Sequence, residues 1–130
     1  VWKGRAKSTR ARVLRVAVGS VVLSFLIQTV WPGPGHAFDH ILFLSGFGLV
    51  MLVVGDRVTL GHSDRMEQTA GKSRLWRWLL WLILLAAATR ASADFKASIL
   101  ISHHIYAAVL WAIVAALWFY HLAGLWWRRP

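Results

Sequence analysis

The chain has no cysteine and only five acidic residues among its 130 positions. The absence of cysteine excludes disulfide bonds and thiolate ligands to a metal. The scarcity of carboxylates argues against acid–base catalysis by paired carboxyl groups. The sequence also lacks a phosphate-binding glycine loop, a G-x-S-x-G nucleophile motif and an H-E-x-x-H zinc motif. A catalytic enzyme is therefore the least favoured class of protein.

Apolar residues dominate what is present. They make up 58% of the chain, and the mean hydropathy is +0.54. The chain also carries a formal net charge of +10 and nine tryptophans. Many of the tryptophans flank apolar runs, as interfacial anchors do in membrane proteins. Because the cations stand beside those runs, the basic character indicates a lipid bilayer and argues against a nucleic acid as the partner.

Four apolar runs are long enough to cross a bilayer, which needs roughly 20 residues per helix. Helices are required because lipid cannot satisfy exposed backbone groups. The sequence thus predicts an all-α, polytopic membrane protein whose 130 residues form a single transmembrane bundle. A Pro-Gly turn at Pro32 to Gly35 separates the first two runs, so we expect the first to be a retained span and not a cleaved signal. The expected spans are about 13–31, 38–54, 75–93 and 99–127.

The basic residues predict the orientation of these spans. Most lysines and arginines precede the first run, lie between the second and third, or follow the fourth. Only Arg90 and Lys96 lie near the opposite side. The positive-inside rule then places both chain ends in the cytoplasm, with residues 1–12 as a basic cytoplasmic segment.

Small residues in the second run indicate close helix packing. Ser45, Gly46 and Gly48 lie together there. Such residues let helix backbones approach one another closely in lipid.

Four histidines fall near the expected outer face of the membrane. Two histidines from one helix and one from another can hold copper, another metal or the iron of a haem. His36 and His40 share a helix face if their helix begins early enough, whereas only one of two adjacent histidines can join them. The candidate metal ligands are His36, His40 and His103, with His104 as the alternative to His103. The competing interpretation is structural, with each histidine capping a helix or contacting headgroups.

His121 differs from these four because it lies inside the fourth run. An ionisable residue at membrane depth is a candidate functional residue. It follows His103 by 18 positions, which places both on one helix face and about 27 Å apart. They would therefore serve two centres, or one of them would be structural.

A polar segment follows the second run on the expected cytoplasmic side. Arg57, His62 and Arg65 form either a solvated, headgroup-binding loop or a clamp for an anion or a cofactor carboxylate. Asp56 would neutralise part of this charge. Near the outer end of the third run, Arg90 is placed to pair with Asp94 or with a cofactor carboxylate.

The second run and its tail resemble the NnrS family of bacterial membrane proteins. The similar positions are His40, Gly48 and the segment Arg57-x-x-Leu60-Gly61-His62-x-x-Arg65, in which Ser63-Asp64 replaces the family's usual Thr-Gly. Arg90 and Trp111 add to a resemblance that extends from Gly35 to Pro130 and corresponds to the C-terminal helices of longer proteins. It implies an inner-membrane protein associated with haem and copper and linked to nitric oxide or redox metabolism. The outer ligands would then be His40 with His103 or His104.

The fourth run alone also resembles the single helix of light-harvesting β polypeptides. His103-x-x-Tyr106, His121 and Trp127 carry this second resemblance. It implies that His121 ligates the magnesium of bacteriochlorophyll and that Trp127 donates a hydrogen bond to the pigment. The alternative function is therefore that of a non-catalytic transmembrane subunit in a larger, photosynthetic complex.

Overall fold

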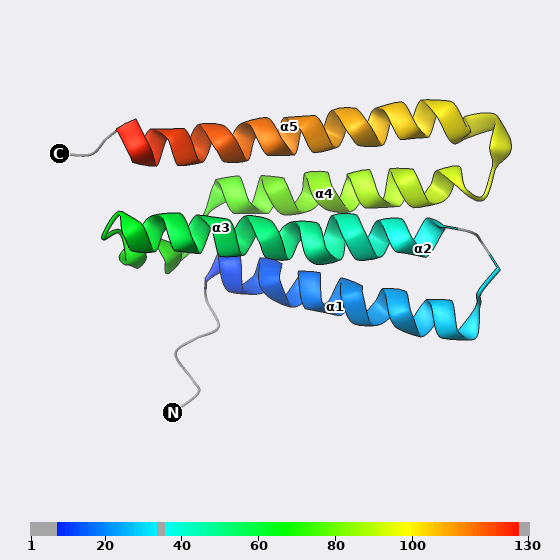
Figure 1. Ribbon diagram of the computed structural model, residues 1–130, viewed down its shortest axis with the longest axis horizontal. Helices are drawn as coiled ribbons and strands as arrows, with labels where there is room; N and C mark the ends of the chain where they lie inside the picture. The colour runs from blue at the N-terminus through cyan, green and yellow to red at the C-terminus, as the bar shows by residue number, and fades with distance from the viewer. Residues whose placement is uncertain (1–7, 34–35, 128–130) are drawn as a thin grey trace.

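A computed structural model describes residues 8–33 and 36–127, and it contains no strand within these ranges. Four long rods lie alongside one another and run alternately in opposite directions (Figure 1). The expected all-α class is thus confirmed. The first rod is α1 (Thr9–Val30), and the second joins α2 (Ala37–His40), the π-helix η1 (Ile41–Gly48) and α3 (Leu49–His62). The third is α4 (Arg74–Ala93) and the fourth α5 (Leu100–Trp127), with short 3-10 helices η2 (Met66–Thr69) and η3 (Ala97–Ile99) in two connections.

Three helical segments among the described residues are long and apolar enough to cross a membrane, namely Thr9–Val30, Ala37–His62 and Ala97–Leu125. The rod α4, which was expected to be a fourth span, does not reach that level of apolarity. It carries Arg77 and Arg90, and it buries one stripe at helical spacing against its neighbours. Trp76, Leu79, Ile83 and Ala86 form this stripe, and each is fully buried.

Two helix boundaries differ from those expected. The first helix begins at Thr9, so residues 9–12 form its opening turn and are not part of a separate basic segment. The second rod continues past Val54 to His62, so Arg57 and His62 are helical and do not lie in a loop. The other parts of these predictions, at residues 1–7, 34–35 and 128–130, lie outside the described residues.

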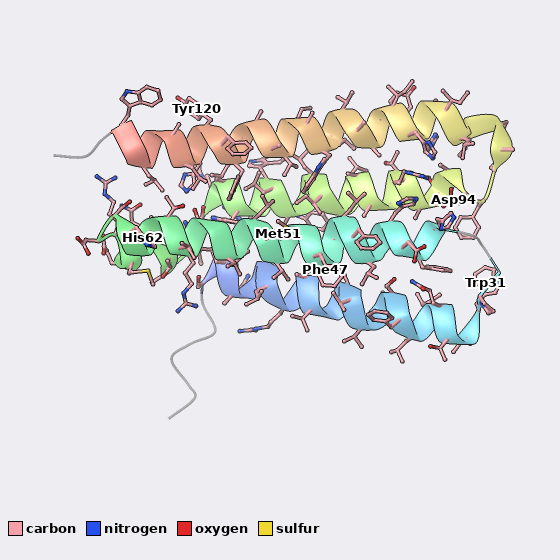
Figure 2. The ribbon with its side chains drawn as sticks, viewed as in Figure 1. Trp31, Phe47, Met51, His62, Asp94 and Tyr120 are labelled. Atoms are coloured by element: carbon pink, nitrogen blue, oxygen red, sulfur yellow. The ribbon has the colours of Figure 1, made fainter. Side chains whose placement is uncertain are left out.

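The alternating rods give the bundle two chemically distinct ends. We call one the basic end, where α1 and α4 begin and α3 and α5 finish; it carries Arg10, Arg57 and Arg65. The other is the histidine end, which carries His36, His40, His103 and His104. Asp94 lies at the histidine end, opposite His62 and Tyr120 (Figure 2). The side of the membrane that each end faces stays a prediction.

The second rod packs closely because glycines face its neighbours. A Cβ on Gly46 would lie 2.7 Å from a methyl group of Val21 on α1. On the side of α5, Gly48 and Gly55 receive the rings of Trp111 and Trp118, where a Cβ would lie 3.3 and 2.8 Å from the ring. The predicted close packing of the second run is therefore present at Gly46 and Gly48.

The π-helix η1 directly follows His40. Two hydroxyl groups donate hydrogen bonds to backbone carbonyls of this region, Ser45 Oγ to Ile41 O and Ser24 Oγ to Phe38 O, each at 2.6 Å. The carbonyl of Ile41 lies in the π-helix itself, and that of Phe38 lies in α2 just before it, so the two hydroxyls add donors at the start of this irregular region, where lipid offers none. Because π-helical turns are frequent at functional sites, this irregularity draws attention to the histidine end.

Candidate functional site

At the basic end, a carboxylate lies fully inside the bundle. The side chain of Asp56, on α3, has no exposed surface. Its Oδ2 atom accepts a hydrogen bond from Arg10 Nε of α1 at 2.5 Å, and its Oδ1 atom lies 2.9 Å from His121 Nε2 of α5. With the carboxylate ionised, the imidazole donates through Nε2. One buried side chain therefore joins three helices.

The guanidinium of Arg10 is held by further contacts. Its Nη1 atom donates to the backbone carbonyl of Gln68 at 2.6 Å, and its charge lies 5.6 Å from the ring centroid of Trp76. A cation over an indole face is stabilised by the ring quadrupole. We call Arg10, Asp56 and His121 the basic-end triad. In it, Asp56 has two side-chain partners, and Arg10 also contacts a backbone carbonyl and an indole ring.

This triad was only partly foreseen from the sequence. His121 was a predicted functional residue, but Asp56 was expected to neutralise part of the charge of the segment with Arg57, and Arg10 fell within the expected basic cytoplasmic segment of residues 1–12. The available signal was a lone carboxylate close after the apolar pair Val53-Val54, with Gly55 between them. A buried charge requires a partner, and cations on neighbouring helices can supply one.

At the histidine end, a second carboxylate lies among imidazoles. Arg90 Nη1 of α4 donates to Asp94 Oδ1 at 3.2 Å, which confirms the predicted pairing. His40 Nε2 lies 3.8 Å from Asp94 Oδ2, which is too far for a hydrogen bond. His104 lies within electrostatic range of His40. We call His40, Arg90, Asp94 and His104 the histidine-end cluster.

Three atoms of this cluster are buried without a hydrogen-bond partner. They are His40 Nε2, His104 Nε2 and Asp94 Oδ2. Buried polar atoms in proteins are nearly always bonded, and an exception often marks a redox or ligand site. A neutral imidazole nitrogen binds the metal of a cofactor through its lone pair, and neither of these two nitrogens is engaged in a hydrogen bond.

The other expected outer histidines lie apart from this cluster. The side chain of His36 is 83% exposed and contacts Asp39, with Nδ1 to Oδ2 at 3.1 Å. His103 has Nδ1 3.3 Å from Ser102 Oγ and faces an apolar groove between α4 and α5. Among the described residues, no three His, Asp or Glu side chains are grouped to hold a metal ion. The expected set of His36, His40 and His103 is therefore not brought together.

The structure does not bring together the three residues of the expected cytoplasmic clamp, Arg57, His62 and Arg65. Arg57 and His62 are exposed, and His62 Nδ1 lies 2.8 Å from the carbonyl of Val58 on its own helix. Arg65 instead lines a pocket with His121. Trp127, the expected pigment partner, is 87% exposed.

Three helices that are long and apolar enough to cross a membrane, with polar groups buried between them, are the features of a multi-pass membrane protein. The chain belongs to the NnrS family, whose model, described as NnrS protein, matches residues 2–129. This match covers nearly the whole chain and so includes the first helix, which precedes the resemblance seen from Gly35 onward. Neither the curated proteins nor the solved structures contain a significant match.

Proposed function

We propose that this NnrS-family protein binds haem at the histidine end of its bundle and acts in a process linked to nitric oxide. His40 and His104 are the residues that would hold the haem. The observation that carries the proposal is that both Nε2 atoms are buried without a hydrogen bond. An iron–imidazole bond would satisfy each nitrogen in a region where water is scarce.

The donor atoms favour haem over a metal ion held by protein alone. A protein-bound copper ion takes three or more side-chain ligands, and the described residues offer no such group of His, Asp or Glu. Haem iron takes one or two axial ligands from the protein, which two histidines can supply. Arg90 lies beside them as a cation for a cofactor carboxylate, although it also pairs with Asp94.

The link to nitric oxide rests on family membership, because the match covers residues 2–129. When bound, haem would supply an iron centre that takes a small diatomic ligand in place of one of the two imidazoles. The protein's own contribution would be to hold the two imidazoles in place and to keep water away from them. This is a binding role, and it requires no catalytic carboxylate pair.

The absorption spectrum of the purified protein tests this proposal. We expect that the full chain, purified in mild detergent and supplied with haemin, shows a Soret band that sharpens with one equivalent of haem. His40→Gln and His104→Gln should each shift or abolish the band. His36→Gln is the matched control and should leave it unchanged, because the His36 side chain is 83% exposed and faces Asp39. Loss of the band in the control alone would refute the ligand assignment.

Nitric oxide itself provides a second test. Adding it to the reduced, haem-loaded protein should shift the Soret band, and the shift should be absent in a sample without haem. If the spectrum of the haem-loaded protein does not change on adding nitric oxide, the proposed link to nitric oxide is wrong even though the protein binds haem.

A further inference from the structure

A second pocket lies at the basic end, away from the proposed haem site. It has a volume of about 330 Å³. Tyr120, one of its lining residues, is on the last turns of α5 (Figure 2). The pocket is lined by Arg65, Gln68, Tyr120, His121, Gly124 and Leu125. It therefore combines a guanidinium, an imidazole, an amide and a phenol with an apolar floor.

The electrostatic surroundings of this pocket favour an anion. Several cations stand at the same end of the bundle, among them Arg57 and Arg65. The nearest buried carboxylate, Asp56, already accepts from both Arg10 and His121. Asp64 and Glu67, which flank Arg65 in sequence, are exposed. The field at the pocket is thus set mainly by positive charge.

The triad also fixes one wall of the pocket. His121 Nε2 is engaged with Asp56 Oδ1 at 2.9 Å, so the imidazole is held at a defined angle while the same side chain lines the pocket. A polar group whose orientation is already fixed loses little conformational entropy when it meets a ligand. Tyr120 and Gln68 can add hydrogen bonds from either side.

We infer that this pocket binds a phosphate group. Guanidinium N–H groups recognise phosphate oxygens, and phenol and amide donors from Tyr120 and Gln68 add to such a site. Two sources share this chemistry: the headgroup of an anionic phospholipid, which the ends of membrane helices meet, and free phosphate. The inference does not depend on haem binding, because it concerns the opposite end of the bundle.

Two probes distinguish the sources. Inorganic phosphate is titrated into the purified protein by calorimetry, and phosphatidic acid is offered in nanodiscs and counted on the released protein by native mass spectrometry. Binding of the lipid alone identifies a headgroup site, and binding of inorganic phosphate identifies a site for the free anion. If neither probe binds to the wild-type protein, the inference is wrong.

The first pair of variants tests the site against general surface charge. Arg65→Gln and Arg57→Gln remove the same charge from the same end of the bundle, but only Arg65 lines the pocket. We expect Arg65→Gln to weaken binding by about tenfold or more, the loss typical of a charge-assisted hydrogen bond. Arg57→Gln should change it by less than about twofold, since exposed charges act weakly. Equal weakening by both variants would reduce the effect to surface electrostatics and overturn the inference.

The second pair fills the pocket without changing any charge. A Cβ at Gly124 would meet no atom within 4 Å, so Gly124→Leu should fold normally while its side chain occupies the pocket. Gly19→Leu, which also extends into open space, is the matched control on α1. We expect Gly124→Leu to abolish binding of the probe with an unchanged or slightly raised melting temperature, because leucine favours a helix more than glycine does, and Gly19→Leu to retain binding. Undiminished binding by Gly124→Leu would place the anion elsewhere.

Discussion

The two ends of the bundle contain the same three chemical groups in different states. At the basic end, Asp56 accepts from Arg10 at 2.5 Å and lies 2.9 Å from His121. At the histidine end, Asp94 accepts from Arg90 at 3.2 Å and lies 3.8 Å from His40. The first triad is closed by hydrogen bonds, whereas the second leaves three buried polar atoms without a partner.

This difference separates a structural role from a binding role. A closed set of buried hydrogen bonds between three helices fixes their relative positions. An open set of the same groups leaves donor atoms unsatisfied in the bundle, and a ligand can satisfy them. We therefore expect substitutions at the basic end to reduce stability, and substitutions at the histidine end to affect ligand binding.

The largest effect is expected for Asp56→Asn, which removes the charge that Arg10 and His121 share. Breaking a buried ion pair by removing one partner costs about 3–5 kcal/mol, because the other charge stays buried. Asp94→Asn is the matched substitution at the histidine end and should cost less, about 1.5–3 kcal/mol, because it weakens a single charge-assisted hydrogen bond to Arg90. Thermal unfolding in detergent, followed by circular dichroism, measures both. If the two variants lose the same stability, the basic end and the histidine end do not differ in structural role.

Gly55→Ala tests whether packing contributes to the rigidity of the basic end. The new Cβ would lie 2.8 Å from Cζ2 of Trp118, whose ring is also held by a hydrogen bond to Leu52. Overpacking of this kind costs about 1–3 kcal/mol. At Gly19, where a Cβ meets nothing within 4 Å, alanine should instead stabilise the helix by about 0.5–1 kcal/mol. The same thermal assay compares them; a stabilising Gly55→Ala would show that the tryptophan ring can move.

Much of the fold was accessible from the sequence. Apolar runs of span length predicted the four rods, and the Ser45 to Gly48 segment predicted close packing in the second rod. The boundaries at Thr9 and His62 were missed because the charged residues Arg10 and Asp56 were taken to lie outside the apolar spans. Each is accommodated within a helix by pairing with the other across the bundle, and the pattern along one helix does not contain that pairing.

The sequence predicted which types of residue form the candidate site, but not which of the histidines lie close together. The sequence placed four histidines at one end, and the structure brings two of them, His40 and His104, within electrostatic range of each other, with His40 also close to Asp94. His36 is separated because it stands at the N-terminal boundary of α2, where its ring contacts Asp39 and extends outward. His103 and His104 are adjacent and point to different surroundings. The rotation of each helix about its axis decides which histidine faces the bundle. The π-helix after His40 changes the number of residues per turn, so an ideal period of 3.6 residues does not predict which side chains meet.

A smaller effect is expected for Trp118→Phe, which removes one hydrogen bond between α5 and α3. Trp118 Nε1 donates to the carbonyl of Leu52 at 3.2 Å. Losing a single neutral bond of this kind lowers stability by about 1 kcal/mol. Trp78→Phe is the control, since its side chain is 66% exposed, and it should leave the unfolding temperature unchanged. If both variants unfold alike, the indole bond does not connect the two helices energetically.

The smallest effect on stability is expected for His104→Phe, and this variant tests the open end directly. Phenylalanine keeps a ring of similar size and removes a buried nitrogen that has no hydrogen bond. Without ligand, stability should be unchanged or raised by up to about 1 kcal/mol, because no bond is broken and an unsatisfied group is removed. The same exchange at His121 breaks the bond to Asp56 and should lower stability by about 1–3 kcal/mol. Unfolding temperatures of the two ligand-free variants give the comparison. If His104→Phe were as destabilising as His121→Phe, the histidine end would be a closed structural network like the basic end, and its nitrogens would not be available for a cofactor.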